Sequence, residues 1–373
     1  MSAGSVRDPA TPAAGTPSPA GTGAAGTSPA SSTSGLRTPS LPPWGVPAVV
    51  AGIAVLTGLL VLATPLGGRT ATVVVFALLL VVVQTALSLA VEGRRRATDR
   101  LVTTSVVLAF LLALLPLFSV LEYTATRGIH RFDVDFFYRS QRSIGARDPG
   151  GGAYHALLGT VEQVGIATLI AVPFGLLVAV YVVEYGRGRL AATIRFFVDV
   201  MTGIPSIVAG LFVLSFWILG LRMGFSGFAA ALALTVLMLP IIVRSAEEML
   251  RLVPSSLREA SLALGVPRWK TILRIVLPTA LPGIVTGVML AVSRVMGETA
   301  PVLLTAFGAA SIVRDPFRGG PQSSLPLFIY QQAGDAQQTA VDRAWTAALT
   351  LILLVMLLNL LARLVTRRST IGR

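Results

Sequence analysis

The chain has 373 residues, of which 54% are hydrophobic and only 13% charged, and its formal net charge is +13. A mean hydropathy of +0.77, with several apolar runs of about 20 residues, excludes an ordinary soluble domain. The basic residues fall mostly in short connections between the apolar runs, which indicates membrane topology and anionic lipid and not nucleic acid. Disulfides are excluded because cysteine is absent, and the two separated histidines do not form a metal-binding pattern.

The N-terminal segment, residues 1–45, consists almost entirely of Ala, Gly, Pro, Ser and Thr. Such a segment has too little apolar surface to offset its ordering entropy, so we predict a disordered low-complexity tail. A cleavable signal peptide is not expected, because no short apolar core follows a basic start.

Eight apolar runs follow the tail, and each is long enough to cross about 30 Å of hydrocarbon at about 1.5 Å per residue. They cover residues 46–66, 71–91, 101–121, 156–183, 193–219, 228–248, 280–308 and 344–364. The connections on the side of the tail hold more arginine and lysine than those on the opposite side, which predicts that both termini are cytoplasmic. Glu162 and Gln163, early in the fourth run, either line the path from the outer side or mark where the membrane begins, and we favour the second interpretation.

The run at 193–219 contains TGIPSIVAG, residues 202–210, in which a helix break is expected at Gly203 and Pro205. One interpretation is that Ser206 caps a second half-helix, whose positive end would attract an anion. The interpretation that these residues favour by themselves is a proline kink without any ligand, because such kinks are common in membrane helices.

The longest connection on the predicted cytoplasmic side, residues 249–274, contains the pattern of a short surface helix. Pro254 opens it, Ser256 and Glu259 suit a capping box, and Gly265 suits a left-handed stop. Its apolar side is too small to be stable alone in water. Either the helix lies on the lipid headgroups or a partner covers it. The residues of the apolar side are Leu257, Ala260, Ser261 and Leu264.

Two charges interrupt the run at 280–308, in the sequence SRVMGETAP. Arg294 and Glu298 are four residues apart, so a continuous helix would place them on one side, where they can neutralise each other. Each charge costs about 2.5 to 3.5 kcal/mol at mid-bilayer, which simple anchoring does not need. The pair is either retained for packing or lines an anion path, with the planar guanidinium matching oxyanion oxygens. Thr299 and Pro301 fit a local bend beside it.

Three stretches of the sequence resemble a known family. The pattern E-A-x(4)-G-x(9)-I-x-L-P, from Glu259 to Pro278, resembles the EAA loop of bacterial ABC-importer permeases, with Ser261 in place of alanine. Together with GIPSIVAGLF at 203–212 and SRVMGETAPVLLTAFG at 293–308, it is similar to the PstA-type permeases of phosphate importers. The resemblance covers about residues 100–365.

The resemblance implies an all-α polytopic protein with a six-span type I importer core and two extra N-terminal helices. Residues 1–45 would be a cytoplasmic tail, 46–91 an extra transmembrane hairpin, and 92–373 the permease domain. The substrate-path residues would be Arg294, Glu298, Thr299 and Ser206, and the ATPase-coupling residues Glu259, Ala260, Ser261 and Gly265.

The implied partners are a PstC-type sister permease, a PstB-type ATPase dimer, an extracytoplasmic phosphate-binding protein and the lipid of the bacterial cytoplasmic membrane. ATP and magnesium would bind the ATPase, and this chain would bind no cofactor. A phosphate-binding loop needs a lysine after a glycine, but the sole lysine of this chain, Lys270, follows Trp269. The chain would therefore not be an enzyme. An ABC permease for sulfate, molybdate or an amino acid, and an ion-gradient transporter, remain alternatives.

Overall fold

The computed structural model describes residues 44–63, 69–318 and 320–371, and these are almost entirely helical. Nearly all of the predicted disordered tail lies outside the described residues. The chain divides into two compact units, residues 1–112 and 113–373, which meet within α3 (Arg94–Gly128). The division into tail, hairpin and permease domain that the resemblance implies stays a prediction.

The N-terminal unit contains α1 (Gly45–Ala63), α2 (Arg69–Val91) and the first part of α3. The first two helices pack against each other. At the turn from α2 to α3, Arg100 donates from Nε to Glu92 at 2.6 Å, and Ser88 donates to the same carboxylate at 2.8 Å. These charge-assisted bonds close the turn.

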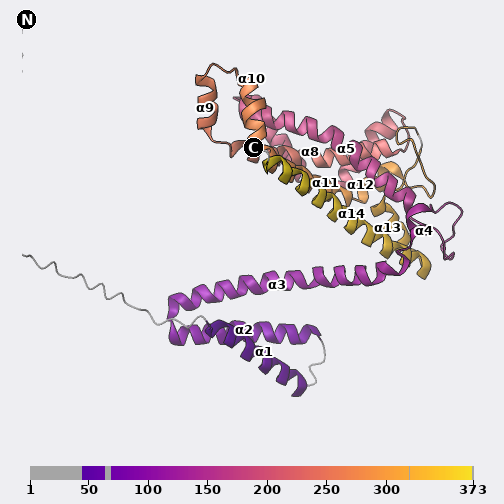
Figure 1. Ribbon diagram of the computed structural model, residues 1–373. Helices are drawn as coiled ribbons and strands as arrows, with labels where there is room; N and C mark the ends of the chain where they lie inside the picture. The colour runs from indigo at the N-terminus through magenta and orange to yellow at the C-terminus, as the bar shows by residue number, and fades with distance from the viewer. Residues whose placement is uncertain (1–43, 64–68, 319, 372–373) are drawn as a thin grey trace, which may run out of the picture. The chain divides into compact units, whose positions relative to one another are not determined.

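The C-terminal unit is a bundle in which α5 (Tyr154–Val180), α8 (Gly227–Arg251), α11 (Leu277–Met296) and α14 (Gln338–Ile371) run alongside one another (Figure 1). At one end of the bundle lie α9 (Ser255–Ala263) and α10 (Arg268–Thr271), and at the other end α4 (Val134–Tyr138) and α13 (Leu325–Ala333). The shorter helices α6 (Arg189–Thr202), α7 (Ser206–Val213) and α12 (Ala300–Ala306) complete it. One 3-10 segment and three π-helical segments, at Ile129–Arg131, Tyr181–Tyr185, Leu214–Gly220 and Ile272–Val276, connect or extend these helices.

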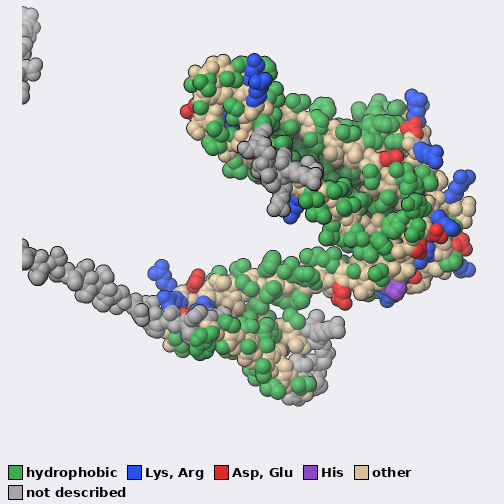
Figure 2. Space-filling model, in the orientation of Figure 1, with side chains coloured by type: hydrophobic (Ala, Val, Ile, Leu, Met, Phe, Trp, Pro, Cys, Tyr) green, Lys and Arg blue, Asp and Glu red, His purple; other side chains and the backbone are tan. Residues whose placement is uncertain are grey.

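The centre of this unit is α8, the most buried of the membrane-length helices. It packs against α5, α11 and α12, and the fully buried alanines from Ala229 to Ala233 let neighbouring backbones approach closely. The outer faces of the bundle are broadly hydrophobic, while charged side chains gather at its two ends (Figure 2). This distribution is the one that a bilayer demands.

Within the described residues, six helices are long and apolar enough to cross a membrane, and a bent helix pair makes a seventh. Of the eight predicted spans, the first, 46–66, corresponds to α1 and extends beyond the described residues. Among the predicted spans, the run at 280–308 has bounds that differ most from those of the observed helix. Its helical span begins earlier, at Arg268, and ends at Met296, so the connection between α8 and α11 is shorter than predicted.

The outer connection after α12 folds back into the bundle around Gln322, whose side chain is buried. It donates from Nε2 to Glu162 at 2.6 Å and accepts from Gln163 Nε2 at 3.0 Å. Gln163 is only 1% exposed. Both side chains therefore bind a segment about 160 residues away in the sequence. Our interpretation of Glu162 and Gln163 as markers of the membrane boundary stays a prediction.

We expect Gln322→Leu to destabilise the bundle, because it leaves the buried Gln163 amide with only the longer bond to the Ser323 carbonyl oxygen, at 3.4 Å, and removes the donor to Glu162. Losing such a partner costs about 1 to 3 kcal/mol. The thermal midpoint of the detergent-purified protein should fall, whereas Gln338→Leu, at an exposed position, should change it little. Equal effects of the two substitutions would contradict the role given to Gln322.

Candidate functional site

The first irregular element is the break between α6 and α7, where the chain turns by 107°. The break contains Gly203, Ile204 and Pro205, and Pro205 occupies the N-cap position of α7 with a φ of −58° and a ψ of 138°. Proline has no backbone N–H and disfavours helical geometry in the preceding residue, which favours a break at this position. The run at 193–219 is therefore two helices and not one straight span.

Ser206 does not cap α7 as we expected. It is the first residue of the helix, the cap position belongs to Pro205, and no side chain bonds to the free N–H groups there. Thr299, at the N-cap of α12, likewise makes no side-chain cap bond. Both side chains are half-buried, and their assignment to a substrate path stays a prediction.

The second irregular element separates α11 from α12. The first helix ends at Met296 with Gly297 as its C-cap, and α12 begins at Ala300 with Pro301 in its first turn. Pro301 suits the first turn of α12, because the N–H that it lacks would have no partner within the helix there.

The break changes the geometry of the predicted charged pair. Arg294 lies in the last turn of α11, but Glu298 lies beyond the end of that helix. The expected placement on one helical face is therefore wrong. The hydrogen bonds and ion pairs of the described residues include none between the two side chains. Arg294 is exposed and Glu298 is half-buried, so the guanidinium is available to another partner.

The two breaks lie next to each other because α7 packs against α12. A Cβ atom added to Gly210 would lie 2.7 Å from the Cα atom of Pro301 and 3.2 Å from the side chain of Leu304. Only glycine permits so close an approach. The tertiary structure thus brings together the two segments that the sequence marks as irregular, and it places Arg294 on the helix that leads into the second one.

The predicted coupling helix is present as α9, with differences at its start and on its inner side. It begins at Ser255 after Pro254 without any side-chain cap bond, so the expected cap by Ser256 is wrong. Gly265 has a φ of +75°, the left-handed conformation that ends a helix at low cost for glycine.

One face of α9 is exposed, and the other face packs against the rest of the C-terminal unit. Glu259 and Ala260 are exposed, and Leu264 is 83% exposed. Ser261, which we grouped with the docking face, is instead buried, and its hydroxyl bonds to the Thr271 hydroxyl at 2.8 Å. In this chain Ser261 therefore connects α9 to α10, while the exposed residues form the surface open to a partner.

Arg258 fixes the orientation of α9, a role that the sequence did not reveal. Its guanidinium pairs with Glu184 at 2.9 Å and donates to the carbonyl oxygens of Val253 at 2.6 Å and Leu250 at 2.8 Å. Both charged side chains are largely buried. The partner carboxylate is 74 residues away in the sequence, so no local pattern could have indicated the pair.

A second group of charges holds α6 against α8. Glu247 is 4% exposed and accepts from Arg195 Nε at 3.0 Å and from Arg251. Arg244 pairs with Asp199 between the same two helices. Removing one member would leave a buried charge uncompensated, which is why these residues occur as a set.

Residues 171–370 match the family described as binding-protein-dependent transport system inner membrane components. The chain belongs to this family. It is 50% identical over 273 residues to the phosphate transport system permease protein PstA 1 of Mycobacterium tuberculosis, a match covering 73% of this chain and 90% of that protein. Identity is 47% to PstA of Mycobacterium leprae, over 72% of this chain and 89% of that protein. The identity to PstA of Pasteurella multocida is 36%, over 72% of this chain and 95% of that protein.

Solved structures support the fold of this inner membrane component. A bacterial alginate ABC transporter, solved in complex with an alginate pentasaccharide-bound periplasmic protein, matches with a TM-score of 0.54 at 15% identity. That match covers 73% of this chain and 96% of the other chain. The fold is therefore that of an ABC-importer permease, and the chain is a multi-pass membrane transport subunit.

We expect Gly210→Ala to separate α7 from α12, because the new methyl group would overlap the backbone at Pro301. Forced overpacking typically costs about 1 to 3 kcal/mol. The thermal midpoint of the purified protein should fall. The matched control is Gly165→Ala, within α5, where an added Cβ meets nothing within 4 Å. That substitution should leave the midpoint unchanged or raise it, and a fall as large as that of Gly210→Ala would refute the close-contact argument.

Proposed function

We propose that this chain is the transmembrane permease subunit of an ATP-driven phosphate importer. The observation that carries the proposal is the 50% identity to a phosphate transport permease along 90% of that protein's length. The matched relatives in other bacteria are also phosphate transport system permease proteins. The exposed Arg294, in the last turn before the break at 297–299, is chemically suited to it, because a guanidinium binds tetrahedral oxyanions through paired hydrogen bonds.

In the proposed mechanism, Arg294 lines a path formed with a sister permease. Arg294 itself is exposed in the single chain, so its guanidinium is open to such a partner. A charge at this depth is tolerable when it faces a partner or a hydrated path and not acyl chains. The broken backbone at 203–205 and 297–299 would line the same path, since irregular backbone at membrane depth needs protein or water around it.

Energy would enter at α9. Its exposed Glu259 and Ala260 would contact a separate ATPase subunit that binds ATP and magnesium, and Arg258 would transmit the motion of α9 to the ends of α5 and α8 through Glu184 and Leu250. Rigid transmission requires such buried, well-directed pairs, because an exposed flexible side chain would absorb the movement.

The proposed location is the bacterial cytoplasmic membrane, with α9 and both termini on the cytoplasmic side. In the C-terminal unit, the end of α14 and α9 lie at the same end of the bundle (Figure 1), so one orientation satisfies both. The partners would be the sister permease, the ATPase dimer and an extracytoplasmic phosphate-binding protein.

The test of the path is uptake of radiolabelled phosphate by cells carrying Arg294 variants. We expect Arg294→Ala to lower uptake by roughly tenfold or more, since a hydrogen bond to a charged group contributes about 1.5 to 3 kcal/mol. Arg294→Lys should restore only part of it, because an ammonium lacks the planar fork. Arg187→Ala, at an exposed arginine outside both breaks, is the control. Normal uptake with both Arg294 variants would remove the proposed role.

The test of coupling is Glu259→Lys, which reverses a charge on the exposed face of α9. We expect the ATPase subunit to be lost when the complex is purified, while membrane insertion of this chain is unchanged. Glu248→Lys makes the same charge change at an exposed position on α8 and should retain the ATPase. Full retention of the ATPase with Glu259→Lys would count against α9 as the contact.

A further inference from the structure

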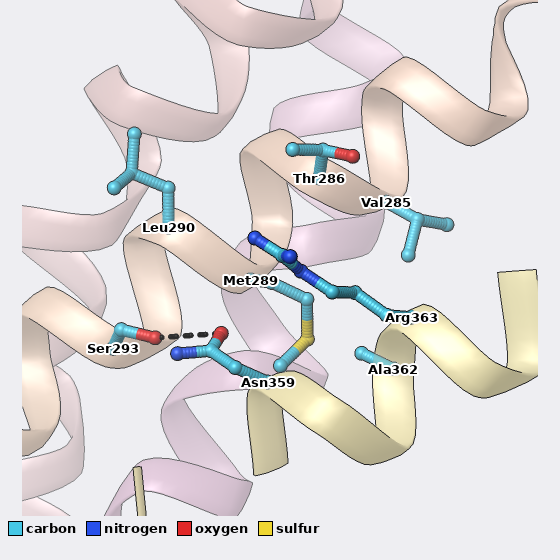
Figure 3. A pocket seen from close by; sticks show the side chains of 8 residues that line it. All are labelled: Val285, Thr286, Met289, Leu290, Ser293, Asn359, Ala362 and Arg363. Atoms are coloured by element: carbon cyan, nitrogen blue, oxygen red, sulfur yellow. Dashed lines mark hydrogen bonds between the residues drawn. The ribbon is translucent and has the colours of Figure 1, made fainter. Parts of the chain in front are cut away.

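A groove of about 480 Å³ lies between α11 and α14 (Figure 3). Most of its lining is apolar, which suits a hydrocarbon chain and not a hydrated ion. The apolar residues are Val285, Met289 and Leu290 on α11 and Ala362 on α14.

The groove also has a polar edge with unused donors. Arg363 extends from α14 toward α11 (Figure 3), is exposed, and has no hydrogen bond or ion pair with any described residue. Asn359 accepts a hydrogen bond from Ser293 at 3.1 Å through its carbonyl oxygen, so its NH2 group is free to donate. A guanidinium and an amide N–H beside an apolar surface are suited to a ligand with an anionic head and an apolar tail.

The depth of the groove agrees with such a ligand. Arg363 lies at the end of the membrane-length segment Gln338–Leu364. A charged side chain at the end of such a segment places the polar edge of the groove near the headgroups. The C-terminal end of α14 lies at the end of the bundle that carries α9 (Figure 1).

We propose that this groove binds one anionic phospholipid, with its phosphate on Arg363 and Asn359 and an acyl chain along the apolar lining. Basic pockets between transmembrane helices on the cytoplasmic side bind anionic headgroups in this way. An apolar helix of a partner in the same place would leave the guanidinium facing hydrocarbon, so charge complementarity favours the lipid. Only the choice of leaflet rests on the proposed function.

The experiment uses the complete complex, purified from nanodiscs that contain equal amounts of phosphatidylglycerol and phosphatidylcholine, with retained lipids counted by native mass spectrometry. Wild type should retain phosphatidylglycerol in preference to phosphatidylcholine. Arg363→Ala should lower that retention about tenfold, the loss expected for one charge-assisted bond. Ala362→Phe should lower it by filling the apolar part while keeping the charge. Arg274→Ala, at an exposed arginine outside the groove, should leave it unchanged.

Three results would overturn the proposal. The first is equal retention by wild type and Arg363→Ala in complexes of the same thermal midpoint. The second is displacement of the lipid by added inorganic phosphate, which would assign the groove to free phosphate. The third is efficient disulfide cross-linking of Ala362→Cys, in this otherwise cysteine-free chain, to cysteines placed on the sister permease.

Failure of the lipid site and failure of the proposed function are distinguishable. Phosphate uptake measured with Arg294→Ala tests the function and makes no use of the groove. Lipid retention measured with Arg363→Ala tests the groove and needs no transported substrate.

Discussion

A membrane-spanning backbone must satisfy its own hydrogen bonds, and the helix ladder is interrupted at two places in the chain, each next to a proline, Pro205 and Pro301. Each proline removes one donor and ends or bends a helix where the surrounding sequence is apolar enough to continue. The exposed carbonyls and N–H groups at such points require protein or water around them. The close contact between Gly210 and Pro301 brings the two breaks together inside one bundle, and much of the functional geometry follows from that placement.

Charged and polar groups within the bundle are handled in different ways according to their surroundings. Arg343 is completely buried, and its guanidinium bonds to Gln332 at 3.0 Å and to the backbone carbonyls of Asp148 at 2.8 Å and Gly150 at 3.2 Å. It thereby holds the outer loop on the start of α14 through hydrogen bonds to carbonyl groups. Glu247 is buried between two arginines, whereas Arg294 has no such arrangement. A buried charge with all its partners serves structure, whereas the exposed guanidinium of Arg294 is available for ligand binding.

The end of the bundle that carries α9 combines rigidity with an open surface. Arg258 and Ser261 fix the inner side of α9 to the ends of α8 and α10, while Glu259 and Leu264 stay exposed. A short helix with so little apolar surface is unstable by itself, so its orientation depends on these polar anchors. Its stable position relative to the membrane helices is what would allow a partner's movement to reach them.

The sequence by itself determined the features that depend on local chemistry. Apolar runs established the membrane class, prolines located the helix breaks, and the motif from Glu259 to Pro278 placed the connection between α8 and α11. Tertiary structure decided the features that depend on distant contacts. It buried Gln163 against Gln322, turned Ser261 inward and paired Arg258 with Glu184. The reason is that backbone breaks and hydropathy are properties of consecutive residues, whereas a side chain's partner is chosen by the packing of helices far apart in the chain.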